Sequence, residues 1–226
     1  MCFSPQADLV AGAFVGACGI DALRHVREPK QLPLAALPLL FAAHQIDEAF
    51  VWWGLDGRVS AQVGRAAMYA YLAFAFVLPL LVPWAIAGVE PDRSRQRWMH
   101  ALGGLGAIVT LVLLTSILRN PVGAQIEHLH ISYRADIDND LVVIGLYIVA
   151  TCGPMLVSSF GALRTFGVLN LFMVVLLGWL LANGFVSLWC AWAAITSVLI
   201  AIYLREPAPP TDTRLRPSHP VGSGGT

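Results

Sequence analysis

Three ionisable side chains stand about one helical turn apart inside an apolar stretch of this 226-residue chain. They are His44, Asp47 and Glu48, within the run from residue 32 to 55. The spacing i, i+3, i+4 places all three on one face of a helix, where they can reach a common ligand. Ionisable groups inside a membrane-length helix are costly and usually functional. The pattern therefore predicts a site here, with Glu48 and Asp47 as its catalytic carboxylates.

Metal binding is the first chemistry open to this face. A neutral imidazole and carboxylates are ligands for zinc or iron, which normally take three or four ligands. His128 and His130 lie in a second polar segment on the same expected side, and with His44 they form the predicted metal set. Bound water would be the nucleophile and Glu48 or Asp47 its proton acceptor. This hypothesis describes a metal-assisted membrane enzyme that acts on a lipid-like substrate.

The same residues support two other hypotheses. Asp47 and Glu48 can exchange protons with His44 inside a polar cavity, as in a proton-coupled transporter of a small molecule. The chain has no visible internal repeat, which many secondary transporters have. Alternatively the carboxylates bond to Arg58, Arg65 or hydroxyls of a neighbouring helix, and the protein has a structural or lipid-binding role.

The elements that position these residues follow from the composition, which is 57% hydrophobic and 12% charged. The mean hydropathy is +0.68. These values are typical of a multi-pass membrane protein. A helix needs about 20 apolar residues to cross a bilayer. We therefore predict an all-α, polytopic fold of seven transmembrane helices, at residues 9–23, 32–55, 66–88, 99–118, 141–160, 166–183 and 185–204.

Basic residues are distributed unevenly between the expected loops. The loops after the first, third and fifth helices and the C-terminal tail carry ten Lys and Arg residues, and the other loops carry four. Basic residues favour the cytoplasmic side, so the N-terminus is expected outside and the C-terminus in the cytoplasm. Residues 1–205 form the predicted transmembrane domain. Residues 206–226, rich in Pro, Gly, Ser and Thr, are expected to be a disordered cytoplasmic tail.

Small residues, prolines and tryptophans fit this membrane interpretation. Prolines inside the predicted helices are expected to bend them without ending them; these are Pro79, Pro83 and Pro154. Glycines in the fourth helix are expected to allow close helix packing; these are Gly103, Gly104 and Gly106. Tryptophans near the outer helix ends are expected to form an aromatic belt; these are Trp52, Trp53, Trp189 and Trp192.

Topology and charge also bear on cysteines and partners. Cys2 and Cys190 are both expected near the outer surface, where they form either a disulfide or two separate thiols.

The formal net charge is zero, so no basic surface for nucleic acid is expected. Membrane lipid and a lipid-like small molecule are the expected partners, and protein partners are not indicated.

Several segments resemble a bacterial membrane protein family of unknown function. They are the start Met1-Cys2-Phe3-Ser4 with Ala7, the segment from Leu32 to Phe41, and the segment from Trp189 to Ala194. The resemblance covers most of the chain. It implies a multi-pass bacterial protein of the cell inner membrane, and it implies no catalytic residues.

Overall fold

The computed structural model describes residues 4–127, 130–137, 139–180 and 185–205, with side chains throughout these ranges except at 175–193. Its elements in chain order are α1 (Pro5–Arg24), the 3₁₀ turn η1 (Pro29–Gln31), α2 (Leu32–Leu55), α3 (Ala61–Val89), α4 (Arg93–Arg119), β1 (Val122–Glu127), β2 (His130–Ala135), α5 (Asp140–Val157), α6 (Gly161–Leu180) and α7 (Phe185–Arg205). The predicted tail, 206–226, lies outside the described residues.

Polar caps set the starts of several helices. The Ser4 hydroxyl accepts a hydrogen bond from the Ala7 N–H at 3.2 Å, and Pro5 occupies the first turn of α1. The Asp92 carboxylate accepts from the N–H groups of Ser94 and Arg95 at 2.7 and 3.0 Å. Such caps satisfy N–H groups that have no partner within the helix. Because of the Asp92 cap, α4 begins at Arg93, six residues before the predicted start at residue 99.

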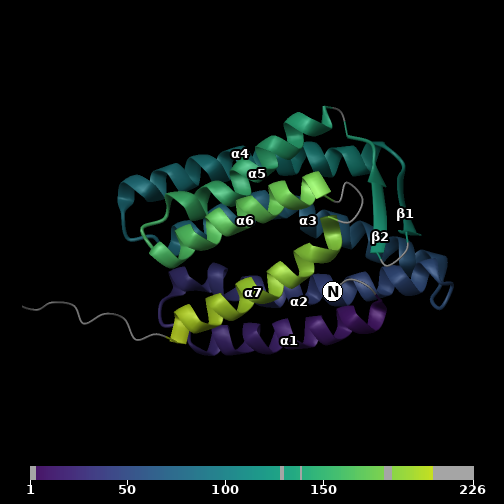
Figure 1. The fold of residues 1–226 in the computed structure, drawn as a ribbon, viewed down its shortest axis with the longest axis horizontal. Coiled ribbons are helices and arrows are strands. Elements are labelled where there is room, and N and C mark those ends of the chain that lie inside the picture. The colour runs from purple at the N-terminus through teal and green to yellow at the C-terminus, as the bar shows by residue number, and fades with distance from the viewer. Residues whose placement is uncertain (1–3, 128–129, 138, 181–184, 206–226) are drawn as a thin grey trace, which may run out of the picture.

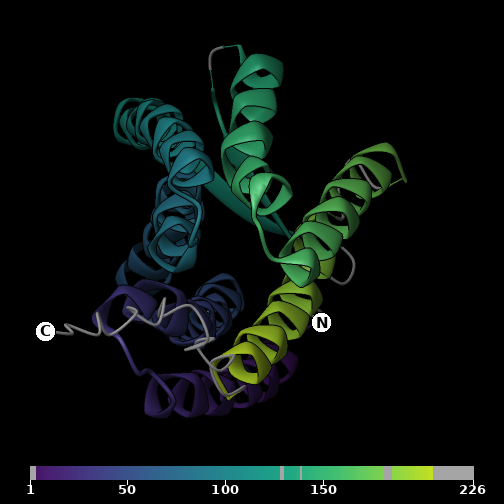
Figure 2. The same ribbon diagram turned by 90° about the vertical axis from the view of Figure 1, so that its left-hand side faces the viewer.

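The helices form an antiparallel bundle in which chain neighbours pack side by side (Figure 1). α1 packs on α2, α2 on α3, α3 on α4, and α5 on both α3 and α4. α7 returns across the bundle to contact α1 and α2 (Figures 1 and 2). The hairpin β1–β2 lies at one end of the bundle, which we call the hairpin end. Arg24, Arg93 and Arg205 lie at the opposite, basic end.

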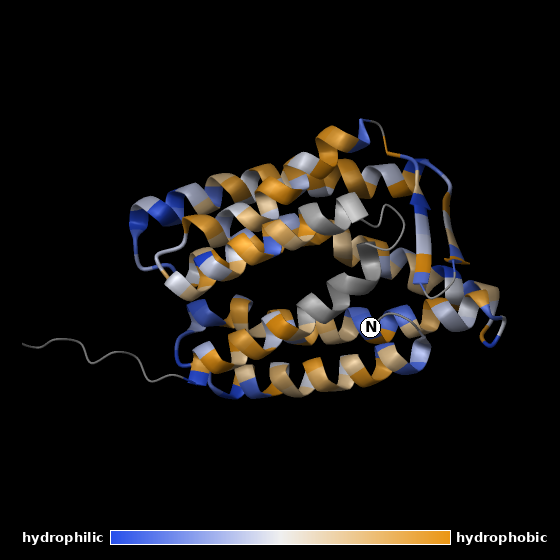
Figure 3. Ribbon diagram, in the orientation of Figure 1, coloured by the Kyte–Doolittle hydropathy of each residue, from blue (hydrophilic) through white to orange (hydrophobic). Residues whose placement is uncertain are grey.

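Five helices are long and apolar enough to cross a membrane, among the residues that the structure describes. They cover Pro5–Arg24, Pro29–Leu55, Ala61–Val89, Arg93–Arg119 and Asp140–Val157. Figure 3 shows hydrophobic residues along the helices and hydrophilic ones at their ends. The described parts of α6 and α7 contribute shorter apolar segments, Gly161–Val174 and Ala194–Arg205. The structure therefore supports a membrane protein, and the exact number and orientation of its spans stay predictions.

A neighbouring helix replaces the hydrogen bond that Pro79 removes from α3. Pro79 has no N–H for the Ala75 carbonyl one turn earlier, and the Tyr147 hydroxyl of α5 donates to that carbonyl at 2.8 Å. The Thr110 hydroxyl of α4 donates to the next carbonyl, that of Phe76, at 2.9 Å. As predicted, the prolines lie inside helices and do not end them.

Two of the three glycines predicted to permit close packing do so. A Cβ added at Gly106 would overlap the Pro79 carbonyl, and one at Gly103 would lie 3.1 Å from the Trp84 indole nitrogen. Gly104 faces open space. The backbones of α3 and α4 therefore approach each other at Gly103 and Gly106, as small residues allow in membrane helices.

The segment between α4 and α5, for which the all-α prediction gives no secondary structure, forms a β-hairpin. Val122 pairs with Ala135 and Glu127 with His130 in an antiparallel register. Apolar and polar residues alternate, so one face carries Ile131 and Tyr133 and packs on the bundle. The base of the hairpin is tied to α4, because Asn120 donates to the Asp136 carbonyl at 2.8 Å.

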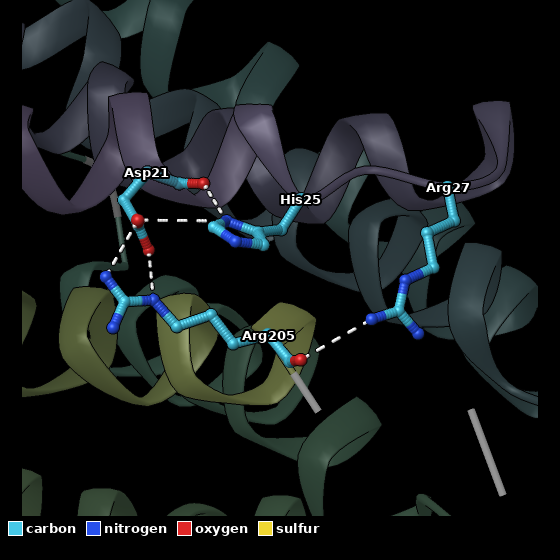
Figure 4. A network of polar contacts seen from close by, with 4 residues as sticks. All are labelled: Asp21, His25, Arg27 and Arg205. Carbon is cyan, nitrogen blue, oxygen red and sulfur yellow. Dashed lines mark hydrogen bonds and ion pairs between the residues drawn. The ribbon is translucent and has the colours of Figure 1, made fainter. Parts of the chain in front are cut away.

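An ion pair joins the first and last helices at the basic end (Figure 4). The Arg205 guanidinium of α7 donates to both carboxylate oxygens of Asp21 in α1, at 2.7 and 2.8 Å. His25 bonds the Asp21 carbonyl at 2.8 Å, and Arg27 donates to the Arg205 carbonyl at 3.4 Å. Bidentate geometry fixes the relative position of the two helix ends.

Candidate functional site

The predicted face of α2 is buried within the bundle. Glu48 is 1% exposed and His44 is 9% exposed, while Asp47 is half-buried. α2 spans the predicted residues 32–55, so the three side chains have the expected helical spacing. The carboxylate of Glu48 interacts electrostatically with that of Asp47. Two acids and an imidazole therefore share one region near the hairpin end of α2.

A third acid, Asp8 of α1, joins this region and is fully buried. Its carboxylate interacts with that of Glu48 across the contact between α1 and α2. The helices pack closely there: a Cβ at Gly12 would lie 2.8 Å from the Ile46 side chain. The indole N–H of Trp52 stands next to the Asp8 carboxylate, although their geometry falls short of a hydrogen bond.

Three stacked rings connect the acids to the hairpin. Tyr71 of α3 stacks on the His44 ring at a centroid distance of 4.0 Å, and Tyr133 of β2 stacks on Tyr71 at 4.7 Å. Phe74 lies against His44 at 4.6 Å. The Tyr71 hydroxyl hydrogen-bonds to Glu48, and the Tyr133 hydroxyl also faces that carboxylate at looser geometry. We call Asp8, His44, Asp47, Glu48, Tyr71 and Tyr133 the acid–aromatic cluster.

Burial and the nearby Glu48 carboxylate raise the pKa of Tyr133 well above its usual value of 10.0. Both causes disfavour the phenolate: burial removes its hydration, and a second negative charge repels it. The Tyr133 hydroxyl therefore keeps its proton at physiological pH. It can donate a hydrogen bond towards Glu48 or pass a proton by exchange.

The hairpin brings Tyr133 to the cluster, but its alternation directs the predicted ligand His130 to the opposite face. His130 pairs with Glu127, and the Glu127 carboxylate accepts from Gln125 and lies 3.6 Å from Arg134. These contacts lower the pKa of Glu127, chiefly through the Gln125 hydrogen bond. The predicted ligand His128 lies outside the described residues.

No group of three or more His, Cys, Asp or Glu side chains within the described residues forms a metal site. The metal set of His44, His128 and His130 therefore stays a prediction. So does the disulfide, because the Cys2 and Cys190 side chains are not among those described. Cys18 and Cys152 are free thiols.

Arg58 and the hydroxyls of α4, which were among the predicted structural partners of the acids, bond elsewhere. Arg58 pairs with Asp56 at 3.9 Å. On α4, the hydroxyls of Thr115 and Ser116 donate to backbone carbonyls, as Thr110 does. Within the described part of the chain, no Lys or Arg forms an ion pair with Asp8 or Asp47.

Several buried polar atoms of the acid–aromatic cluster have no hydrogen-bond partner among the described residues, the Tyr133 hydroxyl included. Both carboxylate oxygens of Asp8, Oδ2 of Asp47 and Nδ1 of His44 are buried and have no hydrogen-bond partner among the residues described. Leaving buried polar groups unpaired is costly and rare in folded proteins. The arrangement can be neutralised by protons or by a cation, and this is the chemistry it offers.

Sequence reasoning found three of the cluster members and missed three. Asp8 lies just before the predicted first helix, residues 9–23, and was not among the predicted site residues. It shares one helix face with Gly12, Val15 and Gly19, all buried, and this stripe of small residues marks the face that packs on α2. Tyr71 and Tyr133 carry no local signal, because tertiary contacts alone bring them to His44.

Comparison with known proteins identifies a family whose function is unknown. No curated protein and no solved structure matches the chain. A model of a family of unknown function matches residues 1–214, which agrees with the predicted membership of an uncharacterised family. The chain therefore belongs to the DUF6629 family of unknown function.

Proposed function

We propose that this membrane protein binds protons at the acid–aromatic cluster and couples them to transport of a small molecule. One observation carries the proposal: Asp8 is fully buried beside Glu48, and no basic side chain among the described residues pairs with it. Carboxyl groups without a basic partner inside a membrane mark proton and ion pathways.

The lack of space around Asp8 favours the proton over larger cations. Its side chain is 0% exposed, so a water-sized particle does not touch it. A metal ion or an organic cation needs volume next to the carboxylate, whereas a proton does not. His44, at 9% exposed, and the two tyrosine hydroxyls supply further groups for proton exchange with Glu48.

The hairpin end is the side from which protons reach the cluster in this proposal. Glu48 precedes the last residue of α2, Leu55, by seven residues, which is about 10 Å along the helix. Basic residues at the opposite end favour a cytoplasmic C-terminus, so the hairpin end would face outward from a bacterial inner membrane.

A metal-assisted enzyme acting on a lipid-like substrate is the second candidate. It is supported by Nδ1 of His44 and Oδ2 of Asp47, which have no hydrogen-bond partner in the described chain and lie one turn apart. In this scheme His128 and His130 would complete the zinc or iron set. Glu48 would take the proton from the attacking water.

Proton uptake by proteoliposomes tests the first candidate. Full-length protein is reconstituted with a pH-sensitive dye inside, and the outer pH is lowered while valinomycin and potassium clamp the membrane potential. We expect wild-type vesicles to acidify faster than empty ones, and Asp8→Asn to remove most of that difference. Asp56→Asn, which changes an exposed acid at the same end, is the matched control. Equal rates for Asp8→Asn and wild type would refute proton handling by the cluster.

Elemental analysis of the purified protein tests the second candidate. About one equivalent of zinc or iron, lost in both His44→Ala and Glu48→Gln, would favour the enzyme. Wild-type protein that stays metal-free after exposure to zinc and iron would count against it. Monodispersity of each variant separates loss of a ligand from loss of the fold.

A further inference from the structure

We propose that the exposed face of α4 formed by Arg93, Arg97 and His100 binds the headgroup of an anionic phospholipid, whose acyl chains lie along Gly104 and Ile108. We call this face the α4 headgroup surface. It lies at the basic end, away from the acid–aromatic cluster, and does not depend on the proton-coupled function.

The length of α4 places this surface at the level of the lipid headgroups. The helix has 27 residues and is therefore about 40 Å long. Its apolar part, residues 101–118, covers about 27 Å and fits a hydrocarbon core of about 30 Å. The first two turns, residues 93–100, then extend beyond the hydrocarbon on the basic end.

The charges of Arg93 and Arg97 are available to a ligand. Both side chains are exposed, and neither makes a hydrogen bond or ion pair within the described residues. Arg95, between them, differs because it donates to the carbonyls of Val157 and Ser158 at 2.8 and 3.1 Å. Positions 93, 97 and 100 share one helix face, and a guanidinium pair binds phosphate oxygens in bidentate geometry.

The surface continues into the hydrocarbon region as an apolar strip with one open position. No atom lies within 4 Å of a Cβ built at Gly104, and Ile108 is 63% exposed on the same face. Trp84 of α3, 56% exposed, borders the strip and meets the His100 ring edge-on at 5.4 Å. Indole rings favour the boundary between headgroups and hydrocarbon. Charge at the headgroup level and an apolar strip below it together fit a phospholipid.

Lipid titration of the detergent-purified full chain tests this surface. Phosphatidylglycerol and zwitterionic phosphatidylcholine are added separately, and bound lipid is counted by native mass spectrometry. The test variant is Arg93→Gln/Arg97→Gln. The control is Arg58→Gln/Arg65→Gln, which removes two exposed arginines at the hairpin end.

We expect wild type to retain phosphatidylglycerol in preference to phosphatidylcholine. Each basic residue near an anionic membrane surface strengthens binding about fivefold, so the test variant should bind phosphatidylglycerol about 25-fold more weakly. The control should bind it like wild type. Equal binding by the test variant and wild type, or equal loss in both double variants, would overturn the proposal. Inorganic phosphate is a further arm, and competition by phosphate alone at matched concentration would mean that the surface binds free anions and not lipid.

Discussion

Replacing Asp8 with valine distinguishes a proton site from a structural ion pair, because the two interpretations predict opposite changes in stability. Asp8 is fully buried, and neither of its carboxylate oxygens has a hydrogen-bond partner among the described residues. A buried polar group in this condition costs about 1–3 kcal/mol. Removing the carboxyl also removes an acid from the first turn of α1, which costs about 0.3–1 kcal/mol. The net expectation is a free energy of unfolding that is unchanged or higher by up to about 2.7 kcal/mol.

Reversible unfolding by SDS in mixed micelles measures this free energy, and the same variant is tested for proton uptake. We expect stability to be kept or gained while proton uptake is lost, the signature of a group retained for function. If Asp8 instead belonged to a buried ion pair, breaking it would cost about 3–5 kcal/mol. A loss of that size in Asp8→Val would refute the reasoning. Asp8→Asn, which keeps the volume, separates loss of the charge from changes in packing.

Three further predictions concern the helix contacts. Gly106→Ala should destabilise the protein by about 1–3 kcal/mol, because the new Cβ overlaps the Pro79 carbonyl. A Cβ at Gly104 meets open space, so Gly104→Ala should be neutral or stabilise the protein by up to about 1 kcal/mol in the same SDS titration. Thr110→Val removes the hydroxyl donor to a carbonyl of α3, so we expect a loss of about 0.6 kcal/mol and at most about 1.7, again by SDS titration. Burial acts to raise the pKa of Glu90, but hydrogen bonds from the turn after α5 outweigh burial and hold that pKa below the usual 4.5. The ionised Glu90 carboxylate therefore stabilises the folded protein above pH 4.5, and this stabilisation is lost as the pH falls through the lowered pKa. Thermal unfolding of Glu90→Gln against pH should lack this acid-dependent step, and an unchanged pH profile would contradict the assignment.

Most helices could be predicted because long apolar runs are a sufficient signal for membrane-length helices. The predicted helix at residues 32–55 coincides with α2. Pro79 and Pro83 lie inside α3, as expected. The predicted start of α4, residue 99, lies six residues after the observed start at Arg93. Its first turns are polar and depend on the Asp92 cap, which a hydropathy average does not register. Averaged hydropathy does not indicate the hairpin either, because polar residues alternate with apolar ones over only six residues in each strand.

The candidate site could be predicted only where it depends on one helix. The spacing of His44, Asp47 and Glu48 is local, so the sequence indicates it directly. Their partners Asp8 and Tyr133 lie on other elements, and their approach depends on how α1 and the hairpin pack against α2 and α3. For His130, pairing within the hairpin decides which face the residue occupies, and the spacing of residues in α2 gives no information on it. Helical periodicity therefore predicts the site residues of α2, whereas those on other elements depend on tertiary packing.

The depth of the acid–aromatic cluster determines what kind of proton movement the bundle permits. Glu48 lies about 10 Å from the hairpin end of α2, so protons have a short path from that side. The other half of α1, α2 and α3 is packed with buried apolar side chains, among them Val15, Leu37 and Ile86. Protons cross such a layer only with the help of polar groups or helix movement, because a bare charge in hydrocarbon is too costly. Proton binding at the cluster is therefore expected to act through rearrangement of the helices, and uptake should saturate with the pH gradient as in a carrier, not increase linearly as in a channel.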